Sequence, residues 1–258
     1  MSNPNWNRAE TLAALHIYFQ LPFGQLHRSQ PKIKQLAQWI DRTANSVALK
    51  LVNLASLDPQ IRASGRKGMG NASALDKAIW IELQTQWDRV ALEAAAEYEK
   101  LASNHGVVPD TDIVEEFADF AEGKTRSANV QVRVNQARFR KAVLASYNST
   151  CCISGLQHDK LVIASHIVPW SKDTKNRLNP QNGLCLSALH DRAYDQGLIT
   201  VLPDYTVRVA KTLKVCKDDS FMHDALLSFH GKPIHLPERF RPAPEFLEFH
   251  ARSFGFMN

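Results

Sequence analysis

Three polar residues within positions 151–199 have the types and spacing of a hydrolytic site. His166 ends a short apolar run, Asn182 lies in an Asn-Gly turn, and His190 opens a stretch with helical spacing. An imidazole can bind a metal ion or accept a proton from water near neutral pH. If the fold brings two imidazoles together, one could hold a cation while the other activates a water molecule.

The residues around these three positions indicate a strand, a loop, a second strand and then a helix. A run of β-branched residues leads to His166, and Leu184-Cys185-Leu186 follows the Asn-Gly turn. The loop between them holds residues that interrupt regular structure, namely Pro169, Asp173, Asn176, Asn179, Pro180 and Gly183. A compact unit of this kind can place a strand His opposite a helix His.

At these residues the sequence resembles the HNH endonucleases with their ββα-metal motif, whose three name-giving positions correspond to His166, Asn182 and His190. The words ASHIVPW, NPQNGLCL and LHDRAYDQGLI are similar to those of the bacterial restriction-type branch. The similarity continues upstream in RVNQARFRKAVLASYNSTCCISG and downstream in HGKPIHLPERFRPAPEFLEFH. It therefore covers roughly residues 130 to 252.

The resemblance implies a role for each of these residues. His166 would be the general base that takes a proton from the attacking water. Asn182 would fix the loop between the strands through side-chain hydrogen bonds. His190 would bind a divalent cation, with Mg²⁺ expected and Mn²⁺ or another divalent ion as alternatives. The products would carry 5′-phosphate and 3′-hydroxyl ends.

One position departs from the family pattern. Many HNH proteins place Asp or His directly before the general base as a second metal ligand, whereas this chain has Ser165. A hydroxyl is a poorer ligand for a hard cation than a carboxylate, so Ser165 contributes weakly or other oxygens complete the shell. Asp195 is a candidate helper, but it lies five residues after His190 and off the same helix face. Catalytic and structural roles are both open for it.

Composition sets the class of protein. The chain has 258 residues, of which 44% are hydrophobic, enough for one large or two small domains with real cores. No apolar run approaches the ~18–20 residues that cross a membrane. The start MSNPNWNRAE lacks the pattern of a secretory signal. We therefore expect a cytoplasmic protein with no membrane partner.

The four cysteines do not form a zinc-binding pattern. Cys151 and Cys152 are adjacent, and Cys185 and Cys216 stand alone, so no C-x₂-C pair is present. We interpret all four as buried or free thiols and expect no structural zinc.

The net charge of +5 is unevenly distributed. Residues 26–67 hold eight basic and two acidic side chains, and residues 123–158 hold six basic and no acidic ones. Residues 82–122 between them hold eleven acidic and only two basic side chains. Two basic regions flanking an acidic one fit contact with a polyanion better than the net value suggests.

The N-terminal part is predicted to be helical. Apolar spacing predicts a helix over residues 6–20 and two short helices within 31–57, with Thr43 as the N-cap of the second. The pair resembles a helix-turn-helix unit that would offer four polar side chains to DNA: Arg42, Asn45, Ser46 and Lys50. The alternative is a helix hairpin that only builds a core.

The middle of the chain adds further candidate DNA contacts. A glycine-rich loop carries Arg66 and Lys67, which could contact phosphates or simply be solvated. One long helix is predicted over 74–104, a linker with a short helix (113–120) over 105–130, and a basic helix over 131–147. That basic helix carries Arg133 and Arg140, to which we assign phosphate contact. A hairpin over 197–209 and a helix over 245–253 complete the chain.

The sequence thus predicts an α+β protein with a mainly helical N-terminal DNA-binding domain (1–104), a linker (105–130) and a C-terminal ββα-metal domain (131–258). The expected activity is metal-dependent cleavage of double-stranded DNA in restriction or phage defence. Because cutting both strands usually needs two sites, a homodimer is expected. The alternatives are a nickase and an inactive DNA-binding regulator that keeps the HNH shape.

Overall fold

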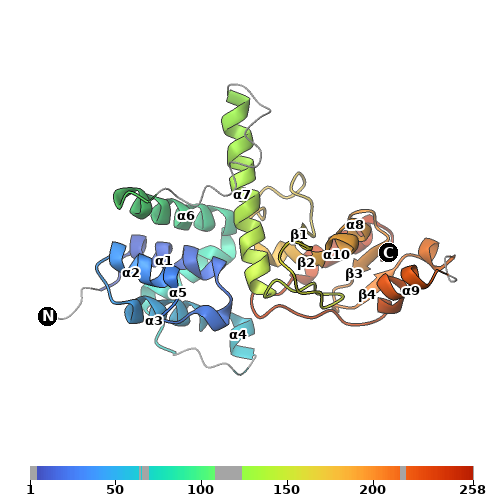
Figure 1. Cartoon of the computed structure of the whole chain (residues 1–258), viewed down its shortest axis with the longest axis horizontal. Coiled ribbons are helices and arrows are strands. Elements are labelled where there is room, and N and C mark those ends of the chain that lie inside the picture. The colour runs from blue at the N-terminus through green and yellow to red at the C-terminus, as the bar shows by residue number, and fades with distance from the viewer. Residues whose placement is uncertain (1–4, 64, 66–69, 108–123, 216–218, 258) are drawn as a thin grey trace. The chain divides into compact units, whose positions relative to one another are not determined.

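The computed structural model describes residues 5–63, 65, 70–107, 124–215 and 219–257 (Figure 1). The chain divides into two compact units. The first contains Met1–Ala142 and Lys175–Leu178, and the second contains Val143–Thr174 and Asn179–Asn258. Most described elements are helices, and two small antiparallel sheets are present, so the architecture is α+β as predicted. The predicted linker lies mostly outside the described residues, with its short helix, and the boundary between the units falls later.

The first unit is helical. Its elements are α1 (Arg8–Gln20), α2 (Pro31–Trp39), α3 (Ala44–Ala55), α4 (Pro59–Ala63), α5 (Ala74–Thr85) and α6 (Trp87–Asn104), and α7 (Lys124–Ser146) runs into the second unit. Two starts follow directly from side-chain caps. Asn7 and Glu10 form a reciprocal capping box at α1, and Thr43 Oγ1 accepts the Ser46 N–H at α3. These observations confirm the predicted helices near 6–20 and within 31–57.

Helix α1 is the centre of the first unit. Every residue from Thr11 to Phe19 is buried, and the helix contacts α2, α3, α5 and α6. A helix that is apolar on all sides must be covered on all sides, which explains this central position.

The single long helix predicted over 74–104 is wrong, because the structure has two helices. Gln86 ends α5 and begins α6 with a non-helical backbone (φ −141°, ψ 60°). Just before it, Thr85 Oγ1 donates to the carbonyls of Ile81 and Glu82 at 3.2 and 3.1 Å. Hydrogen bonds of this kind compete with the helical pattern and favour a bend at this point.

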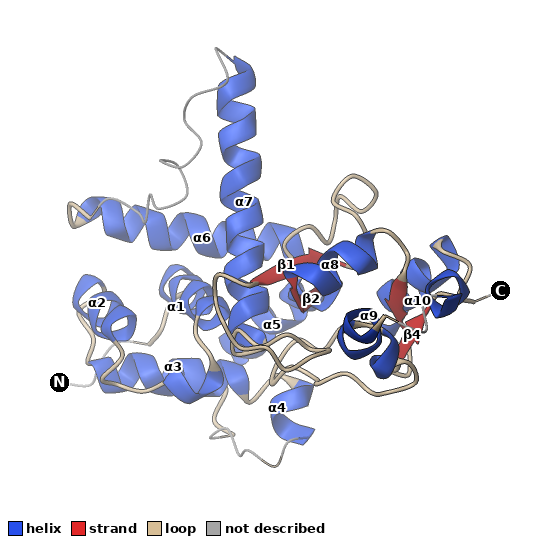
Figure 2. Cartoon of the chain, turned by 45° about the vertical axis from the view of Figure 1, so that its right-hand side comes forward, coloured by secondary structure: helices blue, strands red, loops and turns tan. Residues whose placement is uncertain are grey.

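In its described residues the second unit holds two antiparallel strand pairs, three α-helices of its own and the end of α7. Its strands are β1 (Val162–His166), β2 (Gly183–Ser187), β3 (Ile199–Val201) and β4 (Val207–Val209), and its helices are α8 (Ala188–Asp195), α9 (Ser220–Ala225) and α10 (Pro244–Ser253). β1 pairs with β2 and β3 pairs with β4, each time antiparallel. Figure 2 shows α8 beside the β1–β2 pair, with which it is in contact. The predicted strand-loop-strand-helix order, the hairpin over 197–209 and the last helix are confirmed.

None of the helices that the structure describes combines the length and apolar character needed to cross a bilayer. Cys151, Cys152 and Cys185 are buried free thiols, as predicted. Cys216 lies outside the described residues.

Candidate active site

The β1–β2 hairpin brings the first two candidate residues to one end of the small sheet. In the antiparallel register His166 is opposite Gly183, the residue after Asn182, and Ser165 is opposite Leu184. The next residues begin α8, so strand, strand and helix form one continuous unit.

Asn182 fixes the backbone that follows His166. Its side chain is buried, with Oδ1 accepting the Val168 N–H at 2.8 Å and Nδ2 donating to the Val168 carbonyl at 3.1 Å. The Ile167 N–H donates to the Asn182 carbonyl at 3.0 Å. Three hydrogen bonds therefore join the end of β1 to the start of β2. This geometry is the one that the resemblance implied for Asn182.

His166 stands at the end of β1 and is half-buried. The edge of its ring meets Trp170, with ring centroids 5.5 Å apart and planes nearly perpendicular. An imidazole in this setting keeps contact with solvent while its backbone is fixed, and both properties suit proton transfer with a bound water.

His190 has a different environment. Its side chain is buried, and its Nε2–H donates to the Ala225 carbonyl at 2.9 Å. Nδ1 lies 2.9 Å from Ser187 Oγ and 3.4 Å from Cys151 Sγ. Both ring nitrogens are thus engaged inside the second unit. A metal ion could bind His190 only by displacing one of these contacts.

That His166 and His190 meet at one cation stays a prediction, because the structure shows only which neighbours each ring has. His166 packs against Trp170, whereas His190 is held among Ser187, Cys151 and Ala225. The imidazoles have different surroundings because α8 turns the His190 ring toward α9 and the Cys151 loop. The His190 ring contacts three separate segments of the unit, at Cys151, Ser187 and Ala225. The role implied by the resemblance did not predict these contacts.

Cys151 shares this buried cluster. Burial raises the pKa of its thiol, but hydrogen bonds with His190 and Ser154 outweigh that effect and bring the pKa to about 6. The thiol is consequently more acidic than an ordinary cysteine.

Two carboxylates on α8 were not singled out as a pair from the sequence. Asp191 and Asp195 are four residues apart, so they share a helix face. Burial raises the pKa of Asp191, and the adjacent Ser165 hydroxyl offsets part of that rise. Burial, followed by the charge of Asp191, raises the pKa of Asp195. The four-residue spacing of Asp191 and Asp195 could have identified this pair from the sequence. Considering the position of Asp195 only relative to His190 did not reveal it.

Ser165 adjoins this pair from β1. Its Oγ is buried without a hydrogen bond of ordinary length and angle, although it lies close enough to lower the pKa of Asp191. In the part of the chain that the structure describes, no three His, Cys, Asp or Glu side chains converge as a ligand group. A cation at this place would accordingly need oxygens from serine, water or substrate in addition to those of Asp191 and Asp195.

Two of the predicted DNA contacts need correction. Lys50 is buried and its Nζ lies 2.7 Å from the Asp76 carboxylate. Arg42 lies 2.8 Å from the Glu10 carboxylate, and its guanidinium stacks on the Trp6 ring. Because their charges are satisfied within the first unit, neither side chain is presented to DNA. The helix pair α2–α3 exists, but these two residues belong to its core side.

The other predicted DNA-contacting residues differ in how far they are exposed to solvent. Asn45 and Arg133 are exposed, whereas Ser46 and Arg140 are half-buried. Arg66 and Lys67 lie outside the described residues. Asn45 and Arg133 are therefore the predicted contacts whose side chains reach solvent most fully.

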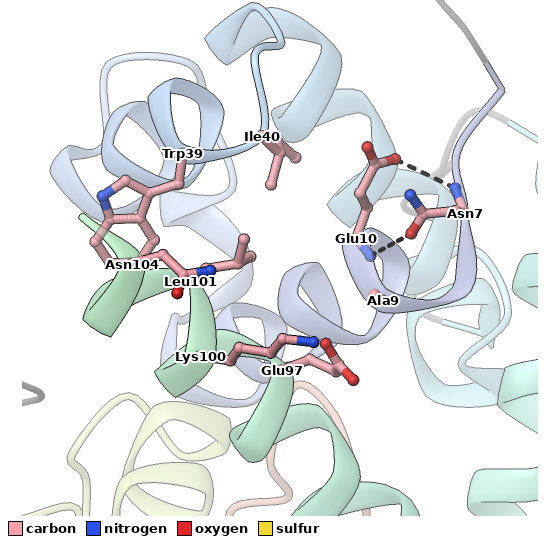
Figure 3. Close-up of a pocket in the computed structure, with 9 residues that line it drawn as sticks. All are labelled: Asn7, Ala9, Glu10, Trp39, Ile40, Glu97, Lys100, Leu101 and Asn104. Carbon is pink, nitrogen blue, oxygen red and sulfur yellow. Dashed lines mark hydrogen bonds between the residues drawn. The ribbon is translucent and has the colours of Figure 1, made fainter.

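A cavity of about 370 Å³ lies in the first unit between α1, α2 and α6 (Figure 3). In Figure 3 Trp39 and Asn104 lie on one side of it, and Asn7 and Glu10 lie on the other. None of the residues predicted to be catalytic lines it. The candidate active site is consequently defined by the β1–β2 hairpin and α8.

Comparison with known proteins agrees with this location. Residues 151–202 match the family model described as HNH endonuclease, which spans the Cys151 loop, both strands of the hairpin and α8. This match is narrower than the resemblance to residues 130–252. No curated protein matches the chain. Residues 151–202 therefore match the HNH endonuclease family, which supports the resemblance over this part of the chain.

Proposed function

We propose that this protein is a metal-dependent DNA endonuclease that acts in restriction or phage defence. One arrangement carries the proposal: a half-buried imidazole, His166, at the end of a strand whose following backbone is fixed by Asn182. The HNH match over residues 151–202 supports nuclease chemistry for this arrangement.

His166 is the proposed general base. It removes a proton from the water that attacks phosphorus, and the leaving group is the 3′ oxygen, so the products have 5′-phosphate and 3′-hydroxyl ends. The hydrogen bonds of Asn182 keep the His166 backbone in place during this transfer. A positioned base of this kind contributes a factor of ~10²–10⁴ to the rate.

The residues that would hold a divalent cation are Asp191, Asp195 and Ser165. Two carboxylates on one helix face and a buried hydroxyl without an ordinary hydrogen bond supply the oxygen ligands that Mg²⁺ prefers. When bound, the cation would neutralise charge on the phosphate. His190 in this proposal supports α8 through Ala225, Ser187 and Cys151.

Double-stranded DNA is the proposed substrate, and Asn45, Ser46, Arg133 and Arg140 are its proposed contacts in the described chain, with Arg66 and Lys67 in the glycine-rich loop. Basic side chains make such binding dependent on salt. A homodimer would place one active site on each strand.

The test is incubation of supercoiled plasmid, with modified and unmodified bases, in Mg²⁺ or Mn²⁺. We expect cleavage that EDTA stops and that His166→Ala slows by ~10²–10⁴-fold. His223→Ala, which changes an exposed histidine of the same unit, is the matched control and should cut at the wild-type rate. Cleavage that survives both EDTA and His166→Ala contradicts the proposal. Counting nicked and linear products separates a nickase from a double-strand endonuclease.

A second candidate is a DNA-binding regulator with an inactive HNH fold. Two observations favour it: Ser165 stands where many relatives have a ligand, and both ring nitrogens of His190 are engaged. Tight DNA binding, without cleavage of any substrate and without Mg²⁺ or Mn²⁺ binding by calorimetry, would favour the regulator.

A further inference from the structure

The connection between β1 and β2 contains four residues, Lys175–Leu178, that cluster with the first unit. Asp88 is their anchor. Its Oδ1 accepts the Leu178 N–H at 2.8 Å, and its Oδ2 accepts the Arg177 N–H at 3.1 Å. One carboxylate thus holds two consecutive backbone amides from a segment about ninety residues later in the chain.

The position of Asp88 suits this task. It is the second residue of α6, where the free N–H groups and the dipole of a helix favour a negative charge. Leu178 is buried, so its N–H requires a partner inside the protein. The break at Gln86 is what starts a new helix here and places a carboxylate in its first turn.

The chain from Leu178 to Asn182 is short and internally hydrogen-bonded. Asn179 Oδ1 accepts the Gln181 N–H at 3.0 Å, and the Asn179 carbonyl accepts the Asn182 N–H at 2.9 Å. Residues Pro180–Asn182 form a 3₁₀ turn. A short, internally hydrogen-bonded segment thus joins Leu178 to Asn182, whose side chain fixes the backbone after the proposed base.

We propose that Asp88 is a positioning residue for the nuclease: it sets the β1–β2 connection and, through Asn182, the placement of His166. The inference rests on the proposed endonuclease function. It gives Asp88 a part in the catalytic arrangement through the short chain from Leu178 to Asn182. Asp88 touches neither substrate nor cation in this proposal.

The experiment compares the full-length protein with Asp88→Asn, Asp88→Glu and Glu97→Gln. Asp88→Asn keeps the side-chain volume but replaces one acceptor oxygen with a donor. Glu97→Gln removes the same charge from the same helix without touching residues 175–178, so it is the matched control. Hydrogen–deuterium exchange of peptides covering 175–182 is measured together with kcat and KM on plasmid DNA, and circular dichroism checks folding.

We expect Asp88→Asn to exchange about tenfold faster over residues 177–178, because a protecting hydrogen bond is lost. Its kcat should fall about tenfold with KM within about twofold of wild type, since misplacement affects the chemical step more than binding. Asp88→Glu should recover part of both, and Glu97→Gln should behave as wild type.

The outcomes separate this inference from the proposed function. Unchanged exchange in a folded Asp88→Asn protein overturns the inference, whatever the nuclease result. Faster exchange with unchanged kcat overturns the positioning role and leaves the nuclease intact. Faster exchange in a protein whose wild type cuts no DNA supports the anchor but removes its catalytic meaning together with the proposed function.

Discussion

The two units use buried polar side chains for different purposes. In the first unit Lys50 and Asp76 lie 2.7 Å apart and join α3 to α5. In the second unit Asn182 forms two hydrogen bonds to Val168 and fixes the backbone next to His166, which stays half-buried. The Lys50–Asp76 ion pair leaves neither charge available to a ligand. The Asn182 hydrogen bonds, in contrast, leave the neighbouring His166 side chain accessible to solvent.

This difference teaches how basic residues should be interpreted in the helical unit. Arg8 likewise forms ion pairs within the first unit: its guanidinium lies 2.8 Å from the Glu82 carboxylate and 3.0 Å from the Glu93 carboxylate. Where a neighbouring carboxylate already pairs with a basic residue, a DNA phosphate must compete with that carboxylate for the charge. The comparison therefore predicts stability effects from the paired cations of the first unit and activity effects from the polar residues of the hairpin.

The largest expected effect comes from Lys50→Met. Removing one partner leaves Asp76 buried with its charge unmatched, which costs about 4 kcal/mol of unfolding free energy. Denaturant titration measures it, and Lys34→Met, at an exposed position on α2, is the control that should cost far less. A Lys50→Met protein with nearly normal stability but weak DNA binding would contradict this difference between the units. It would indicate that Lys50 contacts DNA.

The pH dependence tests both units at once. Burial lowers the pKa of His16 in the first unit to about 3 and that of His250 in the second to about 4. Both imidazoles are neutral in the folded protein, while in the unfolded chain they take up a proton near pH 6.5. The unfolded state therefore binds more protons below that pH, and stability falls as the pH drops from 6.5 toward 4.

For His250 the loss amounts to about 3 kcal/mol between pH 7 and pH 4. Denaturant titrations at both values should show it, and His250→Gln should flatten the dependence. The glutamine can still accept from Thr200 and donate to the Tyr194 carbonyl, the two hydrogen bonds of the native ring. A dependence as steep in His250→Gln as in the wild type would show that this histidine does not cause it.

The smallest expected effect distinguishes the roles of residues on α8. Asp191→Asn should raise the Mg²⁺ concentration for half-maximal cleavage by about tenfold, because an oxygen ligand loses its charge. His190→Ala should leave that concentration unchanged while lowering stability, since the Ala225 carbonyl loses its donor. The reverse pattern, with metal affinity lost in His190→Ala, would restore His190 as a ligand and contradict the assignment to the aspartates.

What the sequence could predict was local. The Thr43 cap, the Asn-Gly turn and the β-branched run before His166 each depend on residues near one another, and the elements they predict are present. The HNH-like sequence stretches identified the site for the same reason, because their residues lie close together in the chain.

What the sequence could not predict depended on distant partners. Lys50 meets Asp76 26 residues later, and His190 meets Ala225 35 residues later. Nothing near Lys50 or His190 in the chain reveals those partners, so a basic side chain suggested DNA contact and a histidine suggested a metal ligand. The bend at Gln86 was missed because the apolar spacing continues through it.

The anchoring of residues 175–178 has a practical consequence for anyone who dissects the molecule. A fragment that begins after Ala142 would contain all of residues 151–202, which match the HNH family model, yet lack Asp88. Its Arg177 and Leu178 amides would lose the carboxylate that accepts their hydrogen bonds, so measurements on such an excised piece would describe a β1–β2 connection without its anchor. Replacing the amino-terminal half with that of another protein would likewise remove the anchor, unless the replacement carries a carboxylate at this place.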